Sequence, residues 1–486
     1  MITYDRLFIA GSWTAPSSPE LLDIRSPHDR TVIGRAAQAR PADVDRAVAA
    51  ARAAFDEGPW PRTAPSERIA VIRRLNALRE ADAEKIAALI SAENGSAGWF
   101  TLAGQPGLGR QAGAYLKAAE ELDWEETLTP SDPDSPTRSV LRREPIGVVA
   151  AVIPWNSPFS AALAKVIPAL LAGNTVVLKV SPENSLSMGF LAELLERSGL
   201  PEGVISVLPA DRETSEYLVS HPDVDKIAFT GSTGAGRRIA SIAGEQLKRV
   251  SLELGGKSAA VILDDADVQQ AVQGLKFASL LNNGEACIAQ TRVLAPRSRY
   301  DEIVTALKNL VESLKVGDPN DPDTFIGPMV RPDQQQRVRD YIELGIKEGA
   351  RLVTGGPQVP PGLEGGNYVT PTVFADVDNS MRIAQEEIFG PVLVVIPYDD
   401  DEDDAVRIAN DSEYGLSGGV WSADQARALA VARRLRTGTV TVNGAPIAFD
   451  GPFGGYKASG IGREYGAVGL AQYVEYKTVT LTPAIS

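Results

Sequence analysis

The stretch Val148-Val149-Ala150-Ala151-Val152-Ile153 is a continuous apolar run whose length and β-branched content predict a buried strand. A turn and a helical pattern from Ser160 to Leu171 follow it. Gly173 ends that helix, and Thr175 to Leu178 predicts the next strand. Two strands joined through a helix form a βαβ unit, whose right-handed crossover lays the strands parallel in one sheet.

The same alternation continues along the chain. Further strands are expected at 204–208, 226–230 and 259–263, with helices at 185–198, 214–220 and 266–281. Such a series predicts an α/β fold built on a doubly wound parallel sheet, in which ligands gather at the carboxyl ends of the strands.

The flanking segments extend this unit. Helical patterns at 41–55 and 66–93 predict packing helices, and the proline-bearing segment 127–136 predicts an extended excursion or linker. A second βα series follows residue 287 and is broken by a loop at 355–366. Because 486 residues exceed one ordinary core, two or more domains are expected.

Cys287 is the only cysteine of the chain and ends a polar, glycine-bearing loop. A single cysteine excludes an intramolecular disulfide and a multi-cysteine zinc site, and it fits a reducing compartment. The alternatives are a reactive nucleophile and an inert buried thiol. The two histidines, His28 and His221, lie in turn-like contexts. If Cys287 is a nucleophile, we expect its base to be a carboxylate, and no metal is expected.

The net charge and the amino-terminal sequence limit the classes of function expected for this chain. A formal charge of −15 argues against nucleic acid or an anionic membrane as the main partner. Charged residues interrupt the first apolar stretch, and no apolar run reaches about 18 residues, so a cytoplasmic protein without membrane association is expected. The acidic run Asp399 to Asp404 predicts a helix start rather than a calcium loop.

Two short motifs could carry chemistry. The segment Phe229-Thr230-Gly231-Ser232-Thr233-Gly234 follows a strand and opens a helix, where free N–H groups can hold a phosphate; a plain strand-to-helix turn is the alternative. Glu253, in Leu252-Glu253-Leu254-Gly255-Gly256-Lys257, lies at a strand end. It could be the missing base or simply the ion-pair partner of Lys257.

These motifs together resemble the aldehyde dehydrogenase superfamily, in its order and spacing. The similarity runs from Leu7 to Lys477 and rests on the following segments: Pro154-Trp155-Asn156, Phe229 to Thr233, Glu253 to Lys257, the Cys287 loop, Glu386 to Val392, and Pro452 to Gly460. It implies a Rossmann-like cofactor domain, an α/β catalytic domain and a small β oligomerisation arm. The corresponding ranges are 1–123 with 147–254, then 255–465, and 124–146 with 466–486.

The resemblance also implies a mechanism. Cys287 would attack the aldehyde to give a thiohemiacetal. The Asn156 side-chain amide and the Cys287 N–H would stabilise the oxyanion. After hydride transfer, Glu253 would activate the water that hydrolyses the thioester. Lys165 and Glu475 match positions assigned to proton relay.

The cofactor residues follow from the same resemblance. Lys179 and Glu387 match the ribose ligands, Trp155 and Phe389 line the nicotinamide side, and Ser232 matches a pyrophosphate contact. The remaining candidates are Ile153, Pro154, Ser181, Glu183, Gly231 and Leu254.

Several positions depart from the family pattern. The acidic ribose ligand usually stands three residues past the lysine, where this chain has Pro182, with Glu183 one step later. Arg212 could meet a 2′-phosphate. NAD is therefore expected and NADP stays open. Glu285 stands where glutamine is common, and a carboxylate facing the thiol would raise the pKa of Cys287.

The substrate expectation rests on two small residues. Ser157 and Ala164 stand where relatives acting on small aldehydes have aromatic tunnel residues, while Ile288, Ile447 and Phe449 are apolar. A wider apolar funnel favours medium-chain, aromatic or terpenoid aldehydes, unless Phe159 or a residue of 104–115 refills the space.

Other readings of the function stay open. A CoA-acylating semialdehyde dehydrogenase and a non-catalytic family member are the alternatives to a hydrolytic enzyme. A homodimer or homotetramer is expected from the resemblance.

Overall fold

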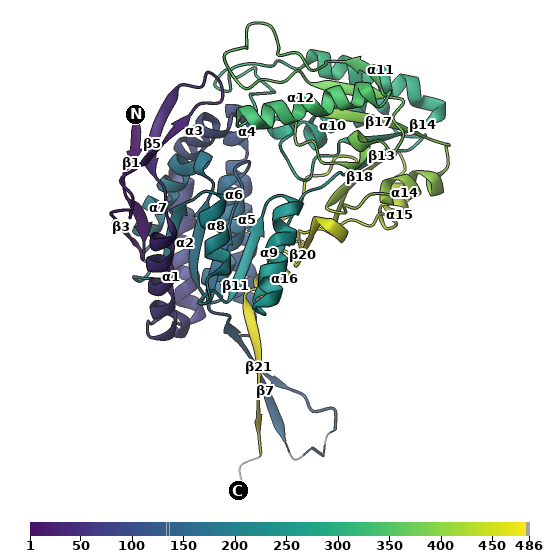
Figure 1. Ribbon diagram of the computed structural model, residues 1–486. Coiled ribbons are helices and arrows are strands. Elements are labelled where there is room, and N and C mark those ends of the chain that lie inside the picture. The colour runs from purple at the N-terminus through teal and green to yellow at the C-terminus, as the bar shows by residue number, and fades with distance from the viewer. Residues whose placement is uncertain (133, 136, 483–486) are drawn as a thin grey trace.

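The computed structural model describes residues 1–132, 134–135 and 137–482, which form two lobes and a projecting arm (Figure 1). The first lobe is built on an eight-stranded sheet. Its strands, in spatial order, are β20 (Gly460–Ile461), β12 (Arg249–Glu253), β11 (Lys226–Thr230), β8 (Val148–Val152), β9 (Thr175–Val180), β10 (Ile205–Pro209), β2 (Leu7–Ile9) and β3 (Ser12–Thr14). The five strands from β12 to β10 run parallel, which confirms the predicted doubly wound sheet.

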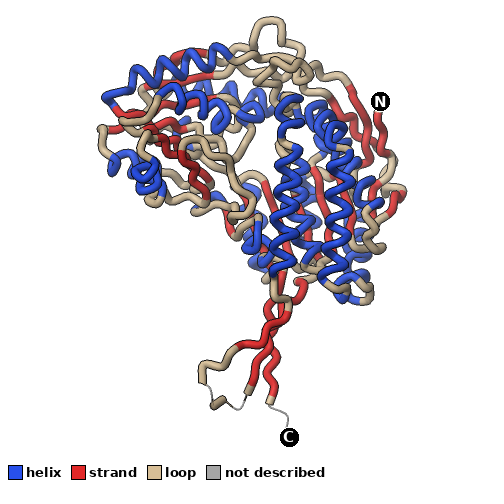
Figure 2. The backbone as a smooth tube through the Cα atoms, turned by 180° about the vertical axis from the view of Figure 1, so that it is seen from behind, coloured by secondary structure: helices blue, strands red, loops and turns tan. Residues whose placement is uncertain are grey.

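Helices cover both faces of this sheet (Figures 1 and 2). Strand β8 shows the reason, because it is apolar on both of its faces. Val148, Ala150 and Val152 join one apolar core, and Val149 and Ala151 join the other. The first core receives α1 (Pro41–Asp56), α8 (Arg212–Ser220) and α9 (Thr233–Glu245). The second receives α2 (Pro65–Ala81), α5 (Gln105–Glu121), α6 (Pro158–Leu171) and α7 (Ser185–Arg197).

Two expected elements differ from the sequence prediction. The helical pattern at 66–93 is split at Asp82 into α2 and α3 (Ala83–Asn94). The predicted strand at 259–263 exists as β13 (Ala259–Ile262), but it lies in the second lobe. It cannot extend the first sheet because the short antiparallel strand β20 already occupies the free edge of β12.

The second lobe is built on a seven-stranded sheet. In spatial order its strands are β15 (Arg351–Thr354), β16 (Thr372–Ala375), β17 (Val392–Tyr398), β14 (Arg292–Pro296), β13, β18 (Ser417–Trp421) and β19 (Thr439–Val442). One face packs against α10 (Val268–Ser279) and α11 (Tyr300–Ser313). The other packs against α12 (Pro332–Lys347), α14 (Glu402–Asn410) and α15 (Gln425–Ala432).

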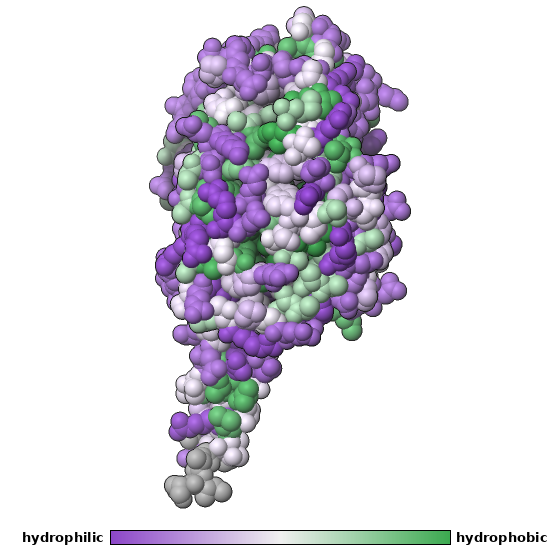
Figure 3. All heavy atoms as spheres, turned by 90° about the vertical axis from the view of Figure 1, so that its left-hand side faces the viewer, coloured by the Kyte–Doolittle hydropathy of each residue, from purple (hydrophilic) through white to green (hydrophobic). Residues whose placement is uncertain are grey.

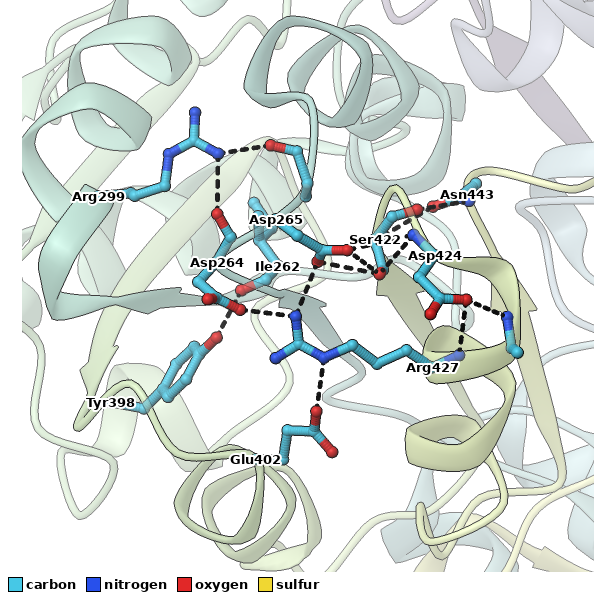
Figure 4. A network of polar contacts seen from close by, with 12 residues as sticks. Ile262, Asp264, Asp265, Arg299, Tyr398, Glu402, Ser422, Asp424, Arg427 and Asn443 are labelled. Atoms are coloured by element: carbon cyan, nitrogen blue, oxygen red, sulfur yellow. Dashed lines mark hydrogen bonds and ion pairs between the residues drawn. The ribbon is translucent and has the colours of Figure 1, made fainter.

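A polar network occupies the carboxyl ends of β13 and β18 (Figure 4). Arg427 pairs with Asp264 at 2.7 Å and Asp265 at 3.1 Å, and its Nε donates to Glu402 at 2.6 Å. The Ser422 hydroxyl donates to Asp265. Arg427 offsets part of this negative charge, and the network joins α14 and α15 to the carboxyl ends of the strands. Asp401 caps α14, which confirms the helix start expected at the acidic run.

The arm is a three-stranded antiparallel sheet of β6 (Glu125–Leu128), β7 (Arg138–Pro145) and β21 (Val474–Leu481). It projects from the first lobe (Figure 1), and apolar atoms are exposed on it (Figure 3). Tyr476, Val479 and Leu481 of β21 are exposed. Of the predicted excursion at 127–136, residues 133 and 136 lie outside the described residues, as do 483–486 of the expected arm.

The carboxyl-terminal segment returns to the first lobe before it reaches the arm. β20 pairs with β12, and α16 (Gly466–Ala471) packs against α5 through Leu470 and the nearby Tyr473. The strand of the arm therefore begins at Val474. A small sheet of β1 (Ile2–Tyr4), β5 (Val32–Ala37) and β4 (Leu21–Arg25) completes the amino-terminal side. Within the described residues, no helix is both long and apolar enough to cross a bilayer.

Candidate active site

The candidate site lies where the two sheets meet end to end. β11 and β12 finish at Thr230 and Glu253, which are register partners. The connection from residue 254 to 258 then crosses to the second lobe, where β13 begins. Cys287 precedes β14, and Glu387 precedes β17. The carboxyl ends of the first sheet thus face the amino ends of the second.

The Cys287 loop is held in an unusual backbone conformation. Asn282, Asn283 and Gly284 all have positive φ values, of 54°, 61° and 74°. The Asn283 side chain donates to the carbonyls of Gly95 and Pro328, both at 3.1 Å. Three consecutive left-handed residues are costly, so these buried hydrogen bonds are what keep the loop in place.

Close packing fixes the loop from the other side. A methyl group added at Gly284 would lie 2.4 Å from the Gly390 carbonyl, and one at Gly256 would lie 2.4 Å from the carbonyl oxygen of Cys287. These glycines are required by close backbone approach. The loop is therefore a rigid support that leaves the Cys287 thiol partly exposed.

The surroundings of Cys287 favour the thiol over the thiolate. Burial is the largest cause and, together with the negative charges of Glu387 and Glu253, raises the pKa of Cys287 to about 12, against a lowering by its backbone N–H. A nearby base or positive charge is needed to form the thiolate.

Glu253 is a buried carboxyl group without a partner. Its side chain is 4% exposed, and neither oxygen accepts a hydrogen bond. Burial and the charge of Glu464 raise its pKa well above the ordinary value, although Lys165 opposes the shift. The Lys257 amine also has no hydrogen-bond partner, so the alternative that Glu253 pairs with Lys257 is wrong. A buried, unpaired carboxyl group is suited to proton transfer.

Lys165 and Glu464 form a buried ion pair with a distance of 2.5 Å. The Lys165 amine also donates to the Thr230 hydroxyl at 2.6 Å. The structure does not bring the predicted Glu475 to Lys165. Glu475 lies on β21, half exposed, and pairs with Arg249 at 2.6 Å. The acidic partner of Lys165 is Glu464 instead of the expected Glu475, because β20 and α16 bring residue 464 back to the first lobe.

Asn156 contacts the Cys287 loop directly. Its Nδ2 donates to the Glu285 carbonyl at 2.8 Å, and its own carbonyl accepts from Asn282 at 2.9 Å. The Glu285 carboxyl group accepts from the Val330 N–H at 3.3 Å, and burial raises its pKa well above the ordinary value. The Glu285 carboxyl group is thus turned toward the Val330 N–H.

The side chains expected at the nicotinamide end lie together. Trp155 and Phe389 meet edge to face at 5.5 Å between ring centroids. Glu387 accepts from the Gly256 N–H at 2.9 Å, and burial raises its pKa. A methyl at Gly255 would lie 2.5 Å from the Glu387 carboxylate. The absence of a side chain at Gly255 is thus what lets Glu387 reach this position.

The opposite end of the cleft carries Lys179 and Glu183. Burial lowers the pKa of Lys179 to about 8, although Glu183 and Asp211 oppose this shift. Ser181 donates its hydroxyl to Glu183 at 2.6 Å, and Arg331 donates to the other Glu183 oxygen at 2.6 Å. The sequence offered no sign of Arg331, because it belongs to the second lobe.

A helix amino terminus lies between these ends. Ser232 caps α9, with its hydroxyl accepting from the Ala235 N–H at 3.3 Å. The Gly231 N–H donates to the Glu253 carbonyl, and the space beside Gly234 is open for at least 4 Å. The free N–H groups of the first turn favour an anion there. Two ribose-type ligand groups flanking this terminus fit a pyrophosphate-linked dinucleotide.

The last three candidates are backbone groups at strand ends. The Ile153 N–H donates to Lys179, the Leu254 N–H donates to Ser459, and Pro154 follows Ile153 directly. None of the three residues has a free N–H group, because two are already hydrogen-bonded and proline has none. A ligand would therefore contact their carbonyl groups.

An aromatic cluster lies beside the thiol. Tyr465 packs against Phe449 at 5.1 Å and Phe453 at 5.3 Å, and it is partly exposed. Burial raises the pKa of its phenol, and the charge of Glu464 adds to this shift, with smaller contributions from Cys287 and Glu253. Tyr465 therefore lies in the same neighbourhood as the thiol.

The residues considered above for the substrate tunnel lie in the core or at the surface. Phe159 is 1% exposed and belongs to the core, and Ala164 is fully buried. Ser157 is exposed. Phe159 therefore packs in the core of the first lobe.

Comparisons with known proteins identify the family of this chain. Residues 13–479 match the model of the aldehyde dehydrogenase family. The geranial dehydrogenase of Castellaniella defragrans is 46% identical, with 99% of each chain covered. A Mycobacterium tuberculosis aldehyde dehydrogenase complexed with NAD⁺ is 47% identical, with a TM-score of 0.96 and 100% and 99% of the two chains covered. An aldehyde dehydrogenase C mutant from Pseudomonas syringae, complexed with NAD⁺ and octanal, is 41% identical, with a TM-score of 0.93 and 98% and 96% covered. This chain therefore belongs to the aldehyde dehydrogenase family.

Proposed function

We propose that the protein oxidises an aldehyde to a carboxylic acid with NAD⁺ and hydrolyses a thioester formed on Cys287. The observation that carries this proposal is that Glu253 lies near the only thiol of the chain. Glu253 is buried, has no hydrogen-bond partner and lies close enough to raise the pKa of Cys287. An uncompensated carboxyl group at this place is costly to folding, which is understandable if it transfers protons.

Cys287 attacks the aldehyde carbon, and its proton is taken by a base. The oxyanion that forms needs fixed donors. Asn156 is held against the loop by its hydrogen bond to the Glu285 carbonyl, and its Nδ2 has a second hydrogen to donate. The Cys287 N–H is the other candidate donor.

The second half-reaction needs a proton acceptor for water. Glu253 takes this role in the proposal, and the neighbouring pair of Lys165 and Glu464 tunes its pKa from both directions. Lys165, Thr230 and Glu464 are joined by hydrogen bonds. This chain of polar groups supports a path by which the proton leaves Glu253.

The cofactor in this proposal is NAD⁺, which accepts hydride from the tetrahedral carbon. Lys179 and Glu183 would hold one ribose, and Glu387 would hold the other. The amino terminus of α9, with Gly231 and Ser232, would hold the pyrophosphate. Trp155 and Phe389 would exclude water from the nicotinamide side. Carbonyls of Ile153, Pro154 and Leu254 complete the cradle.

The substrate class is a bulky apolar aldehyde. Ser157 and Ala164 supply no ring to the tunnel, and Tyr465, Phe449 and Phe453 form an apolar wall instead. Two relatives point the same way, because one is named for geranial and the other was solved with octanal. The unpaired Glu253 disfavours the CoA-acylating alternative, which has no use for a base that activates water.

The arm supports assembly into a homodimer or homotetramer. The three arm strands leave β6 and β21 as edges, and β21 exposes apolar side chains. Edges of this kind are completed by a partner strand. The domain ranges 1–123 with 147–254, 255–465 and 124–146 with 466–486 go with this proposal, except that residues 460–473 are moved to the first lobe, because β20 pairs with β12 and α16 packs against α5. A reducing compartment such as the cytoplasm would keep Cys287 active.

A Glu253→Gln variant tests the proposal. It should release one burst of reduced nicotinamide per site when mixed with octanal and NAD⁺, then turn over on the order of 10²-fold more slowly, because acylation does not need the water-activating base. Stopped-flow absorbance of the reduced nicotinamide measures both phases. Cys287→Ala is the control and should give no burst. An unchanged steady-state rate in Glu253→Gln would place the base elsewhere, and dependence on CoA would favour the acylating alternative.

A further inference from the structure

An ion pair joins the two lobes beside the candidate cofactor site. Arg331 directly precedes α12 of the second lobe, and Glu183 lies in the turn that follows β9 of the first lobe. Their atoms Nη1 and Oε1 are 2.6 Å apart, although the residues are 148 positions apart in the sequence. The side chains are 35% and 18% exposed, so the pair is partly shielded from water.

Both oxygens of Glu183 are occupied in this pair. One accepts from the Ser181 hydroxyl and the other from Arg331, each at 2.6 Å. Burial would raise the pKa of Glu183, but the Arg331 charge and the Ser181 hydroxyl outweigh it and lower the pKa. The carboxylate is therefore ionised, and the guanidinium, which Asp333 also contacts, offsets part of its charge.

Asp333 fixes the orientation of the Arg331 guanidinium toward Glu183. The Arg331 atoms Nε and Nη2 donate to the two oxygens of Asp333, at 2.9 and 3.2 Å. This fork fixes the guanidinium plane and leaves Nη1 to face Glu183.

The pair lies at the position of a doubly wound sheet where a protein distinguishes NAD from NADP. In a doubly wound sheet, an acidic group beyond the second strand of the first βαβ unit accepts from the 2′-hydroxyl of NAD, whereas an arginine accommodates the 2′-phosphate of NADP. β9 is that second strand. Here the acid and the arginine are both present, bound to each other, with Lys179 beside them.

We propose that Arg331 is a positioning residue that sets the choice between NAD⁺ and NADP⁺ by holding Glu183 and offsetting part of its charge. The inference rests on the proposed function of this site. With Arg331 in place, a 2′-phosphate meets a carboxylate whose charge is partly offset, and the 2′-hydroxyl of NAD⁺ must compete with Arg331 for its acceptor. Both effects reduce the preference for NAD⁺. Without Arg331, the free carboxylate would bind the diol and repel the phosphate.

Calorimetric titration of the full chain with NAD⁺ and with NADP⁺, without aldehyde, tests the inference. Arg331→Met should raise the ratio of NAD⁺ to NADP⁺ affinity about tenfold, the effect expected of one uncompensated charge near the phosphate in a partly exposed site. Arg339→Met is the matched control, because Arg339 lies on the same helix and contacts the Pro357 carbonyl instead. It should leave the ratio unchanged.

Glu183→Gln separates an indirect from a direct role. This variant should lower the ratio by improving NADP⁺ binding, and adding Arg331→Met to it should change the ratio less than about twofold. An unchanged ratio in Arg331→Met overturns the inference. So does a loss of NADP⁺ binding when Arg331→Met is added to Glu183→Gln, because Arg331 would then meet the phosphate itself. If the wild-type chain binds neither dinucleotide, the proposed function fails as well.

Discussion

Lys165 and Glu464 meet at 2.5 Å behind Glu253, and the two side chains act on Glu253 in opposite directions. The Glu464 charge favours the protonated form of Glu253, while the Lys165 charge favours the ionised form. Burial is the largest cause of the raised pKa of Glu253, and the pair adjusts the pH at which Glu253 becomes a base.

Glu464→Gln should move the acidic limb of the pH profile of turnover to lower pH. The variant removes a negative charge and leaves Lys165 uncompensated, and both changes lower the pKa of Glu253. Above that limb, turnover should fall because the proton loses an acceptor on its way out. The pH dependence of kcat measures the shift. Glu475→Gln is the matched control, and a shift in that variant instead would restore the original assignment of the relay to Glu475.

The alkylation of Cys287 should depend on Glu253 and not on Glu285. Glu253 is one of the charges that raise the pKa of Cys287, so Glu253→Gln should move the pH profile of iodoacetamide reaction downward. The Glu285 carboxyl group is turned to Val330, so Glu285→Gln should leave the profile in place. With a single cysteine in the chain, incorporated label reports this site alone. A downward shift in Glu285→Gln would show that its carboxylate reaches the thiol.

Cofactor affinity should weaken as pH rises through about 8. The pKa of Lys179 is lowered to about 8 by burial, so the amine is charged below this pH and neutral above it. A charged amine binds ribose hydroxyls and phosphate oxygens more strongly than a neutral one. The dissociation constant of NAD⁺ between pH 6.5 and 9.5 measures the effect. In Lys179→Arg the charge persists, so a decline of the same size in this variant would assign it to another group.

The sequence predicted the elements and residues that depend on local pattern. The βαβ unit follows from apolar runs and a glycine within about thirty residues, and Cys287, Glu253 and Asn156 lie in short motifs. It did not predict the partners that meet from distant parts of the chain. Lys165 and Glu464 are 299 residues apart, and Glu183 and Arg331 are 148 apart. Such pairs depend on how β20, α16 and α12 pack, and periodicity carries no signal for that.

Tyr465 should determine the preference for bulky aldehydes. The backbone of Tyr465 has a φ of 65°, and its N–H donates to the Tyr115 hydroxyl at 2.8 Å, which in turn donates to the Ala164 carbonyl at 3.0 Å. These hydrogen bonds fix the backbone of Tyr465 relative to α5 and α6, which carry Tyr115 and Ala164. We expect the Tyr465 ring to form one wall of the approach to the thiol. An apolar chain that packs against it gains about 0.8 kcal/mol for each methylene it buries.

We therefore expect octanal to exceed acetaldehyde in kcat/KM, and Tyr465→Ala to reduce this advantage about tenfold by removing one aromatic wall. Tyr465→Phe should keep it, because the ring rather than the hydroxyl makes the contact. The exposed Tyr217, which bonds Asp45 on the outer surface, gives the matched control Tyr217→Ala. Equal kcat/KM for the two aldehydes in the wild-type protein would contradict the bulky-substrate proposal. An equal loss for both aldehydes in Tyr465→Ala would mean that Tyr465 supports the fold of the site rather than its specificity.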